Sequence, residues 1–189
     1  MRVAIGLVLL AACACAGAQT LVAHLDPASR FDFVLTTRWG QALQGRFGPG
    51  TGEVEQLPDG RRQVRLRIDA RTIEIVDHPR YTAITRGPRF FDVARYPDLQ
   101  FLSDPYPSQL LRDGGALHGL LRIHGVQRRA RFQLQPSACD RPGRDCDIVA
   151  SGSVRRGDFD LDGWRVALRE EVRFDLRVRI QPLAAEPAP

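Results

Sequence analysis

Alternating aspartates are the densest group of side chains in this sequence that could do chemistry. Carboxylates at positions 158, 160 and 162 precede Gly163, which repeats the D-x-D-x-D-G start of a calcium-binding loop. In such a loop the carboxylates converge on a hard cation, and the glycine permits a tight turn. The twelfth position, however, holds Arg169 instead of a bidentate Glu, and no flanking helices are expected. The pattern therefore favours a solvated turn, with calcium binding as the alternative, and we predict no metal site.

The four cysteines fall into two pairs. Cys13 and Cys15 lie in an apolar N-terminal run, whereas Cys139 and Cys146 flank a polar stretch with Pro142-Gly143 at its centre. Pro-Gly marks a turn between two strands, so the two later sulfurs are expected to meet where the strands open into the loop. Their spacing fits neither a zinc site nor a C-x-x-C redox motif. We predict a Cys139–Cys146 disulfide, which is typical of an oxidising compartment.

No familiar catalytic or phosphate-binding motif occurs in the chain. Ser151-Gly152-Ser153 is not a nucleophile elbow, and both Gly-x-Ser-x-Gly and His-Glu-x-x-His are missing from the sequence. The glycine-rich residues 44–52 lack the Gly-Lys-Ser/Thr of a P-loop, so they favour a bent strand at a barrel corner. The four histidines are scattered, and His118 and His124 are expected on the solvent face of one strand. We therefore predict no catalytic residue.

The basic residues are all arginines. The 27 arginines give a net charge of +5, but they alternate with acids along the predicted strands, as in residues 171–179. A mixed row of this kind forms ion pairs between neighbouring strands on a solvated face. The composition therefore predicts no nucleic-acid partner.

Apolar and polar residues alternate with period two over most of the chain, which predicts strands. The clearest cases are residues 64–71 and 172–180. One helix is expected at residues 79–86, because Pro79 suits a first helical turn and Gly87-Pro88 stops the helix. We count about eight strands joined mostly by short turns, and the length of the last one favours a barrel that encloses a ligand. The predicted fold is all-β: an eight-stranded antiparallel barrel with one short helical insertion that acts as a lid.

The N-terminal residues predict export. An apolar run at residues 3–16 is followed by Ala16-Gly17-Ala18, so residues 1–18 are typical of a secretory signal peptide, and the run is too short to span a bilayer. As an alternative, Leu10-Ala11-Ala12-Cys13 resembles a lipoprotein processing site, which would leave Cys13 acylated and the protein tethered to a membrane. Residues 19–182 are expected to form one barrel domain, and residues 183–189 a disordered tail rich in Pro and Ala.

Six blocks resemble, in order, the motifs of the YceI-like family. The match with the most identities is Phe90-Phe91-Asp92-Val93-Ala94-Arg95-Tyr96-Pro97, and the blocks together span nearly all of the chain after the signal. The other five blocks are residues 29–33, 45–47, 68–73, 119–126 and 155–159. The chain departs from the family pattern at Thr37, where His is common, at Ala130, where Pro is common, and at Asp160, where Gly is common.

This resemblance implies a lipocalin-like barrel that is exported to the bacterial periplasm. It also implies that the interior holds a polyisoprenoid or another long-chain amphiphile such as a quinone or a fatty-acid-like chain, and that the protein forms a homodimer. We predict no cofactor. The departures from the family pattern leave the identity of the ligand open.

An apolar chain needs few polar contacts to bind tightly. Each buried CH₂ contributes about 0.8 kcal/mol, so about twenty carbons outweigh the several kcal/mol that association costs. The candidates to line the cavity are the inward apolar residues Phe31, Phe33, Leu35, Leu66, Ile68, Tyr81, Ile84, Phe90, Phe101, Leu121, Ile123, Phe132, Phe174, Leu176 and Val178.

Three functions therefore stand beside one another at this stage. The first is an exported binding protein that carries a long-chain lipid or isoprenoid ligand. The second is an exported barrel enzyme that acts on a lipid-like substrate, and the third is a structural or stress-related module whose interior is filled by its own side chains.

Overall fold

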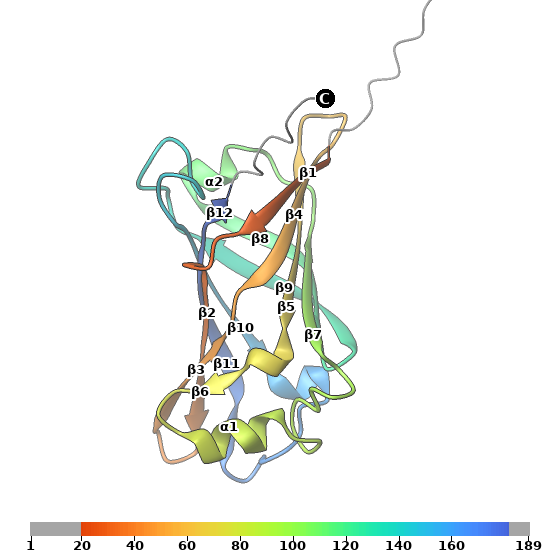
Figure 1. Ribbon diagram of the computed structural model, residues 1–189, viewed down its shortest axis with the longest axis vertical. Helices are drawn as coiled ribbons and strands as arrows, with labels where there is room; N and C mark the ends of the chain where they lie inside the picture. The colour runs from red at the N-terminus through yellow and green to blue at the C-terminus, as the bar shows by residue number, and fades with distance from the viewer. Residues whose placement is uncertain (1–19, 182–189) are drawn as a thin grey trace, which may run out of the picture.

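The alternating segments fold into one antiparallel sheet that curls on itself (Figure 1). The computed structural model describes residues 20–181, so the predicted signal peptide with Cys13 and the predicted tail lie outside the described residues. The order of strands in the sheet is β12-β1-β4-β5-β7-β8-β9-β10-β11-β2-β3-β6. The strands are β1 (Thr20–Leu25), β2 (Arg30–Thr37), β3 (Ala42–Phe47), β4 (Gly50–Gln56), β5 (Arg62–Asp69), β6 (Glu74–Ile75), β7 (Asp98–Ser103), β8 (Gly115–Ile123), β9 (Val126–Leu134), β10 (Ile148–Arg155), β11 (Leu168–Val178) and β12 (Ile180–Gln181).

The prediction of an eight-stranded closed barrel is wrong in its count and its closure. Ten strands have six or more residues, two have only two residues, and the terminal strands β6 and β12 do not pair with each other within residues 20–181. The sheet is therefore a curled half-barrel. Short breaks raise the number of strands: Gly48-Pro49 separates β3 from β4, and Arg179 separates β11 from β12. The break at Gly48-Pro49 also sends its two strands to different neighbours, because β3 pairs with β2 while β4 pairs with β1.

The predicted helix is confirmed as α1 (Pro79–Arg86), with Gly87 as its C-cap. Its Thr82 hydroxyl accepts a hydrogen bond of 2.8 Å from the Ile75 amide, which fixes the helix to β6. The interpretation as a lid over the cavity is wrong, because Phe90 and Phe91 beyond the helix are buried and fill this end of the half-barrel. A short helix that was not predicted, α2 (Leu110–Asp113), lies at the opposite end (Figure 1).

Two 3₁₀ turns complete the secondary structure of the described chain. They are η1 (Ala70–Thr72), which follows β5, and η2 (Arg156–Phe159), which follows β10. Within residues 20–181, the helices are all too short or too polar to cross a membrane.

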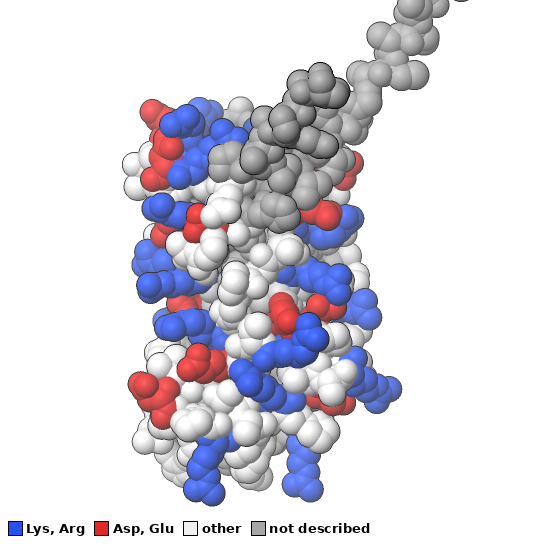
Figure 2. All heavy atoms as spheres, in the orientation of Figure 1, with Lys and Arg blue, Asp and Glu red and all other residues white. Residues whose placement is uncertain are grey.

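The outer face of the sheet carries the predicted ion pairs between strands. Glu53 and Arg65 are directly opposite on β4 and β5, with Oε2 and Nη1 3.2 Å apart, and Asp32 and Arg46 are opposite on β2 and β3 at 3.0 Å. Figure 2 shows acidic and basic side chains interspersed over the visible face. Exposed pairs of this kind contribute about 0 to 1 kcal/mol each, so they set solubility and register more than stability.

Seven phenylalanine rings cross the interior in an unbroken series of contacts, with ring centroids 5.1 to 6.4 Å apart. Such tilted and edge-on pairs stabilise a core beyond the area that they bury. In order of contact they are Phe101, Phe132, Phe174, Phe33, Phe47, Phe91 and Phe90. Several of the rings lie against glycines; for example, a Cβ at Gly45 would stand 2.0 Å from the Phe33 ring, and one at Gly119 would stand 2.7 Å from the Phe101 ring.

A buried arginine holds the end of the half-barrel nearest α1. Arg156 is 1% exposed, and its guanidinium donates to the carbonyl oxygens of Leu161 (2.6 Å), Gly163 (2.5 Å) and Arg169 (3.0 Å). Burial lowers the pKa of this guanidinium from its ordinary value, and the Glu170 carboxylate opposes that shift. Arg156 therefore fixes the loop between η2 and β11 by satisfying carbonyl groups that no ladder reaches.

We predict that Arg156→Met destabilises the domain strongly. The carbonyl oxygens of Leu161, Gly163 and Arg169, one buried and two partly buried, lose their donor. At about 1 to 3 kcal/mol for a buried unsatisfied acceptor and less for a partly buried one, the free energy of unfolding should fall by about 3 kcal/mol. Urea denaturation followed by circular dichroism measures this change. The matched control is Arg169→Met, whose side chain is exposed. Its effect should stay within about 0.5 kcal/mol, and equal losses in the two variants would contradict the assigned role of Arg156.

Candidate functional site

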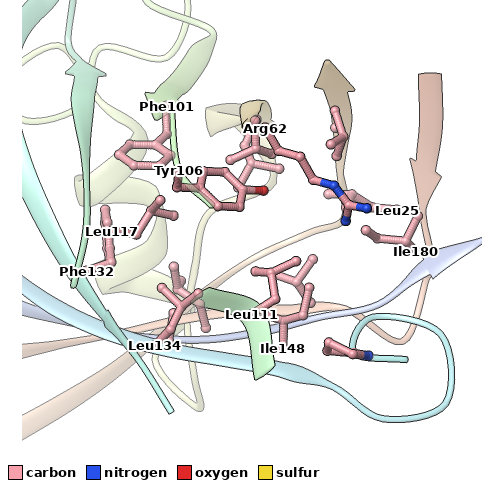
Figure 3. A pocket seen from close by; sticks show the side chains of 18 of the residues that line it. Leu25, Arg62, Phe101, Tyr106, Leu111, Leu117, Phe132, Leu134, Ile148 and Ile180 are labelled. Atoms are coloured by element: carbon pink, nitrogen blue, oxygen red, sulfur yellow. The ribbon is translucent and has the colours of Figure 1, made fainter. Parts of the chain in front are cut away.

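The end of the half-barrel opposite α1 is hollow. A cavity of about 650 Å³ extends from the aromatic rings to an opening beside α2 and the loop between β9 and β10. Figure 3 shows apolar side chains from several strands pointing into this space. Ligand sites in proteins are typically 300 to 1,000 Å³ and mostly apolar, so the cavity has the size and chemistry of a binding site for one apolar molecule.

Side-chain burial changes along single strands in step with this hollow. On β11, the inward residues Val172 and Phe174 are buried, whereas Leu176 and Val178 are only half-buried although they face the interior. Inward residues that keep accessible surface have no opposing side chain to cover them. The interior is therefore filled on the α1 side of the aromatic rings, which we call below them, and open on the α2 side, above them.

Nine of the fifteen predicted lining residues border the cavity. They come from β2, β5, β7, β8, β9 and β11, and four of them are phenylalanines. These nine are Phe31, Leu66, Ile68, Phe101, Leu121, Phe132, Phe174, Leu176 and Val178.

The other six predicted residues lie away from the cavity. Tyr81 and Ile84 are on the outer surface of α1, 47% and 39% exposed, because the helix covers the filled end. Four more are buried in the filled half, where core neighbours surround them: Phe33, Leu35, Phe90 and Ile123.

Sequence reasoning missed much of the upper wall and the whole opening. Leu117, Leu134 and Ile148 line the cavity, and their period-two alternation carried the signal that could have found them. Tyr106 also lines it, but it lies beyond the end of β7 between two prolines, where no periodicity applies.

The opening carries polar and charged side chains. They are Arg62 at the start of β5, Arg112 of α2, and Asp140, Arg141 and Arg144 of the β9–β10 loop. This arrangement places an apolar interior behind a polar rim, which is the layout expected for an amphiphile with a long chain and a polar end.

The predicted Cys139–Cys146 disulfide is confirmed and closes the loop at the opening, with Cα atoms 6.1 Å apart. A hydrogen bond to β12 also holds this loop, because the Ile180 amide donates to the Gly143 carbonyl at 2.7 Å. Asp140, Arg141 and Arg144 border the cavity and lie between the two cysteines. The disulfide therefore helps to position the residues of the opening.

The alternating aspartates do not form a metal site. Asp162 pairs with Arg165, and Asp160 adopts a left-handed turn with φ of 55° after η2. Within the part of the chain that the structure describes, no three His, Cys, Asp or Glu side chains come together in a way that could hold a metal ion. The run is therefore a turn that the Arg156 guanidinium secures through the Leu161 and Gly163 carbonyls.

Comparison with known proteins identifies the domain. The family model of the YceI-like domain matches residues 24–180. No curated protein matches the sequence.

Solved structures share the fold at low identity. BcnA of Burkholderia cenocepacia is 17% identical with a TM-score of 0.63, and the match covers 82% of this chain and 98% of BcnA. A polyisoprenoid binding domain from Saccharophagus degradans, implicated in plant cell wall breakdown, is 17% identical with a TM-score of 0.60, covering 86% of this chain and 99% of that domain. The YceI protein of Campylobacter jejuni is 18% identical with a TM-score of 0.55, covering 72% and 84%.

We predict that a thiol reductant destabilises the parent protein through its single described disulfide. Closing a loop of this length contributes about 2 to 3 kcal/mol by restricting the unfolded chain, so dithiothreitol should lower the free energy of unfolding by that amount. The matched control is the double variant Cys139→Ala/Cys146→Ala, which should have the lower stability from the start and show no response to the reductant. A parent protein whose urea midpoint does not move on reduction would contradict the prediction.

Proposed function

This chain belongs to the YceI-like domain family, and from that premise we propose that it binds a long-chain lipid or isoprenoid inside its half-barrel. The observation that carries the proposal is the apolar cavity of about 650 Å³ above the phenylalanine rings. One structural neighbour, the polyisoprenoid binding domain from Saccharophagus degradans, supports the same ligand class. The nine predicted residues that border the cavity are the proposed contacts with the chain of the ligand.

The size of the cavity suits a ligand of about twenty carbon atoms. One water molecule takes up about 30 Å³ of the liquid, so a cavity of about 650 Å³ has room for roughly twenty groups of that size. At about 0.8 kcal/mol for each buried CH₂, a chain of this length outweighs the cost of association. Apolar walls therefore supply most of the affinity.

We also propose that the protein works in an oxidising compartment after export. The disulfide between Cys139 and Cys146 supports this location, as does the signal-like sequence of residues 1–18. Acylation at Cys13 and a homodimer stay predictions. Of the two other functions, an enzyme lacks an assigned catalytic residue, and a fully filled module does not fit the cavity above the rings.

Mass spectrometry of the isolated protein tests the proposal. Protein purified without detergent and extracted with organic solvent should release about one long-chain lipid per chain, or the emptied protein should take one up from a lipid extract. A protein that releases no lipid and takes none up would contradict the proposal.

A substitution that fills the cavity tests the location of the ligand. Val178→Trp places a large side chain in the hollow from β11, so we expect at least tenfold weaker binding of a fluorescent long-chain fatty acid, measured by titration. The matched control is Val166→Trp, because Val166 is 85% exposed and lies outside the cavity. Equal binding by the two variants, both shown to be folded by circular dichroism, would place the ligand elsewhere.

A further inference from the structure

Two polar side chains near the opening, those of Arg62 and Tyr106, face the apolar cavity. Tyr106 is 6% exposed, and its hydroxyl points into the space that Leu25, Phe101 and Leu117 border (Figure 3). Among the side chains of residues 25–181, which the structure describes, neither this hydroxyl nor the Arg62 guanidinium forms a hydrogen bond or an ion pair. Both polar groups keep surface that faces the cavity, so a ligand inside it can supply the partner that the described side chains do not.

The backbone sets these two side chains beside each other. The Arg62 amide donates to the Tyr106 carbonyl and the Tyr106 amide donates to the Arg62 carbonyl, both at 2.8 Å, which makes the two residues a directly opposed antiparallel pair. Directly opposed residues project their side chains on the same face, here the face of the cavity. Pro105 and Pro107 restrict the backbone on both sides of Tyr106, so its position is fixed before any ligand arrives.

The chemistry of the pair selects the partner. A guanidinium can only donate hydrogen bonds, whereas a phenol can donate or accept. Burial raises the pKa of Tyr106, with Arg62 opposing the shift, so the phenol keeps its proton at neutral pH. A group that lies between the two side chains is therefore offered donors from both sides, and an oxygen acceptor satisfies them.

We infer that the ligand ends in an acceptor oxygen, a carbonyl or a carboxylate, which accepts hydrogen bonds from the Tyr106 hydroxyl and the Arg62 guanidinium. This inference rests on the proposed function, because the chain of the ligand fills the apolar part of the cavity. The two donors stand near the opening, so they hold the polar end there while the chain extends toward the phenylalanine rings. They select among chains of equal length by their terminal group.

Three probes of equal chain length test the inference: hexadecane, 2-hexadecanone and hexadecanoate. Each is titrated against the neutral fluorescent probe N-phenyl-1-naphthylamine bound to the full mature protein. The parent protein should bind the ketone and the carboxylate more tightly than the hydrocarbon. Tyr106→Phe should weaken binding of the ketone and the carboxylate about fivefold and leave the hydrocarbon within twofold, because only one hydrogen bond is lost. Arg62→Met should weaken the carboxylate more than the ketone, since it also removes a charge.

The control is Tyr96→Phe, whose ring packs on His124 away from the cavity with centroids 4.3 Å apart. It should change none of the three affinities, and thermal unfolding should show that both phenylalanine variants keep the parent fold. If Tyr106→Phe leaves all three affinities unchanged, or lowers all three equally, the inference is overturned while the proposed function stands. If none of the three compounds displaces the probe from the parent protein, both the proposed function and the inference are wrong.

Discussion

The contact between phenylalanine rings across the inside of the curled sheet is the interaction on which the rest of the structure depends. Phe33 touches both Phe47 and Phe174, so it joins rings from β2, β3 and β11. The series of rings fills the half-barrel near α1 and ends at the floor of the cavity. One end of the interior thereby supplies the stability of a packed core, and the other end is free to stay hollow.

The features that could be predicted are those set by residues close together in the sequence. Pro79 and Gly87-Pro88 bound α1 at the predicted residues, since helix limits are set by the chemistry of the first and last turns. The alternation in β11 placed Phe174, Leu176 and Val178 inward, and all three border the cavity. The disulfide also followed from local sequence, because a Pro-Gly turn brings the ends of a short loop together.

Closure and the extent of the hollow depend on contacts between distant segments, which alternation does not report. The chain breaks at Gly48-Pro49, and β3 and β4 on its two sides pair with different strands. No local sequence pattern distinguishes such a break from a bulge within one continuous strand. Inward position is likewise insufficient to predict cavity lining: Phe33 and Phe174 both face inside, but only Phe174 borders the cavity. Tyr106 was missed because its place comes from pairing with Arg62, which is far from it in the sequence.

The central claim is that an apolar chain occupies the space above the rings with its polar end at the opening. A crystal structure of the protein as isolated, without detergent or extraction, tests it most directly. The account predicts continuous density for one extended chain that runs from Tyr106 to the ring of Phe174. An interior in which the side chains of β5 and β11 meet across the half-barrel and leave no space above the rings would contradict it.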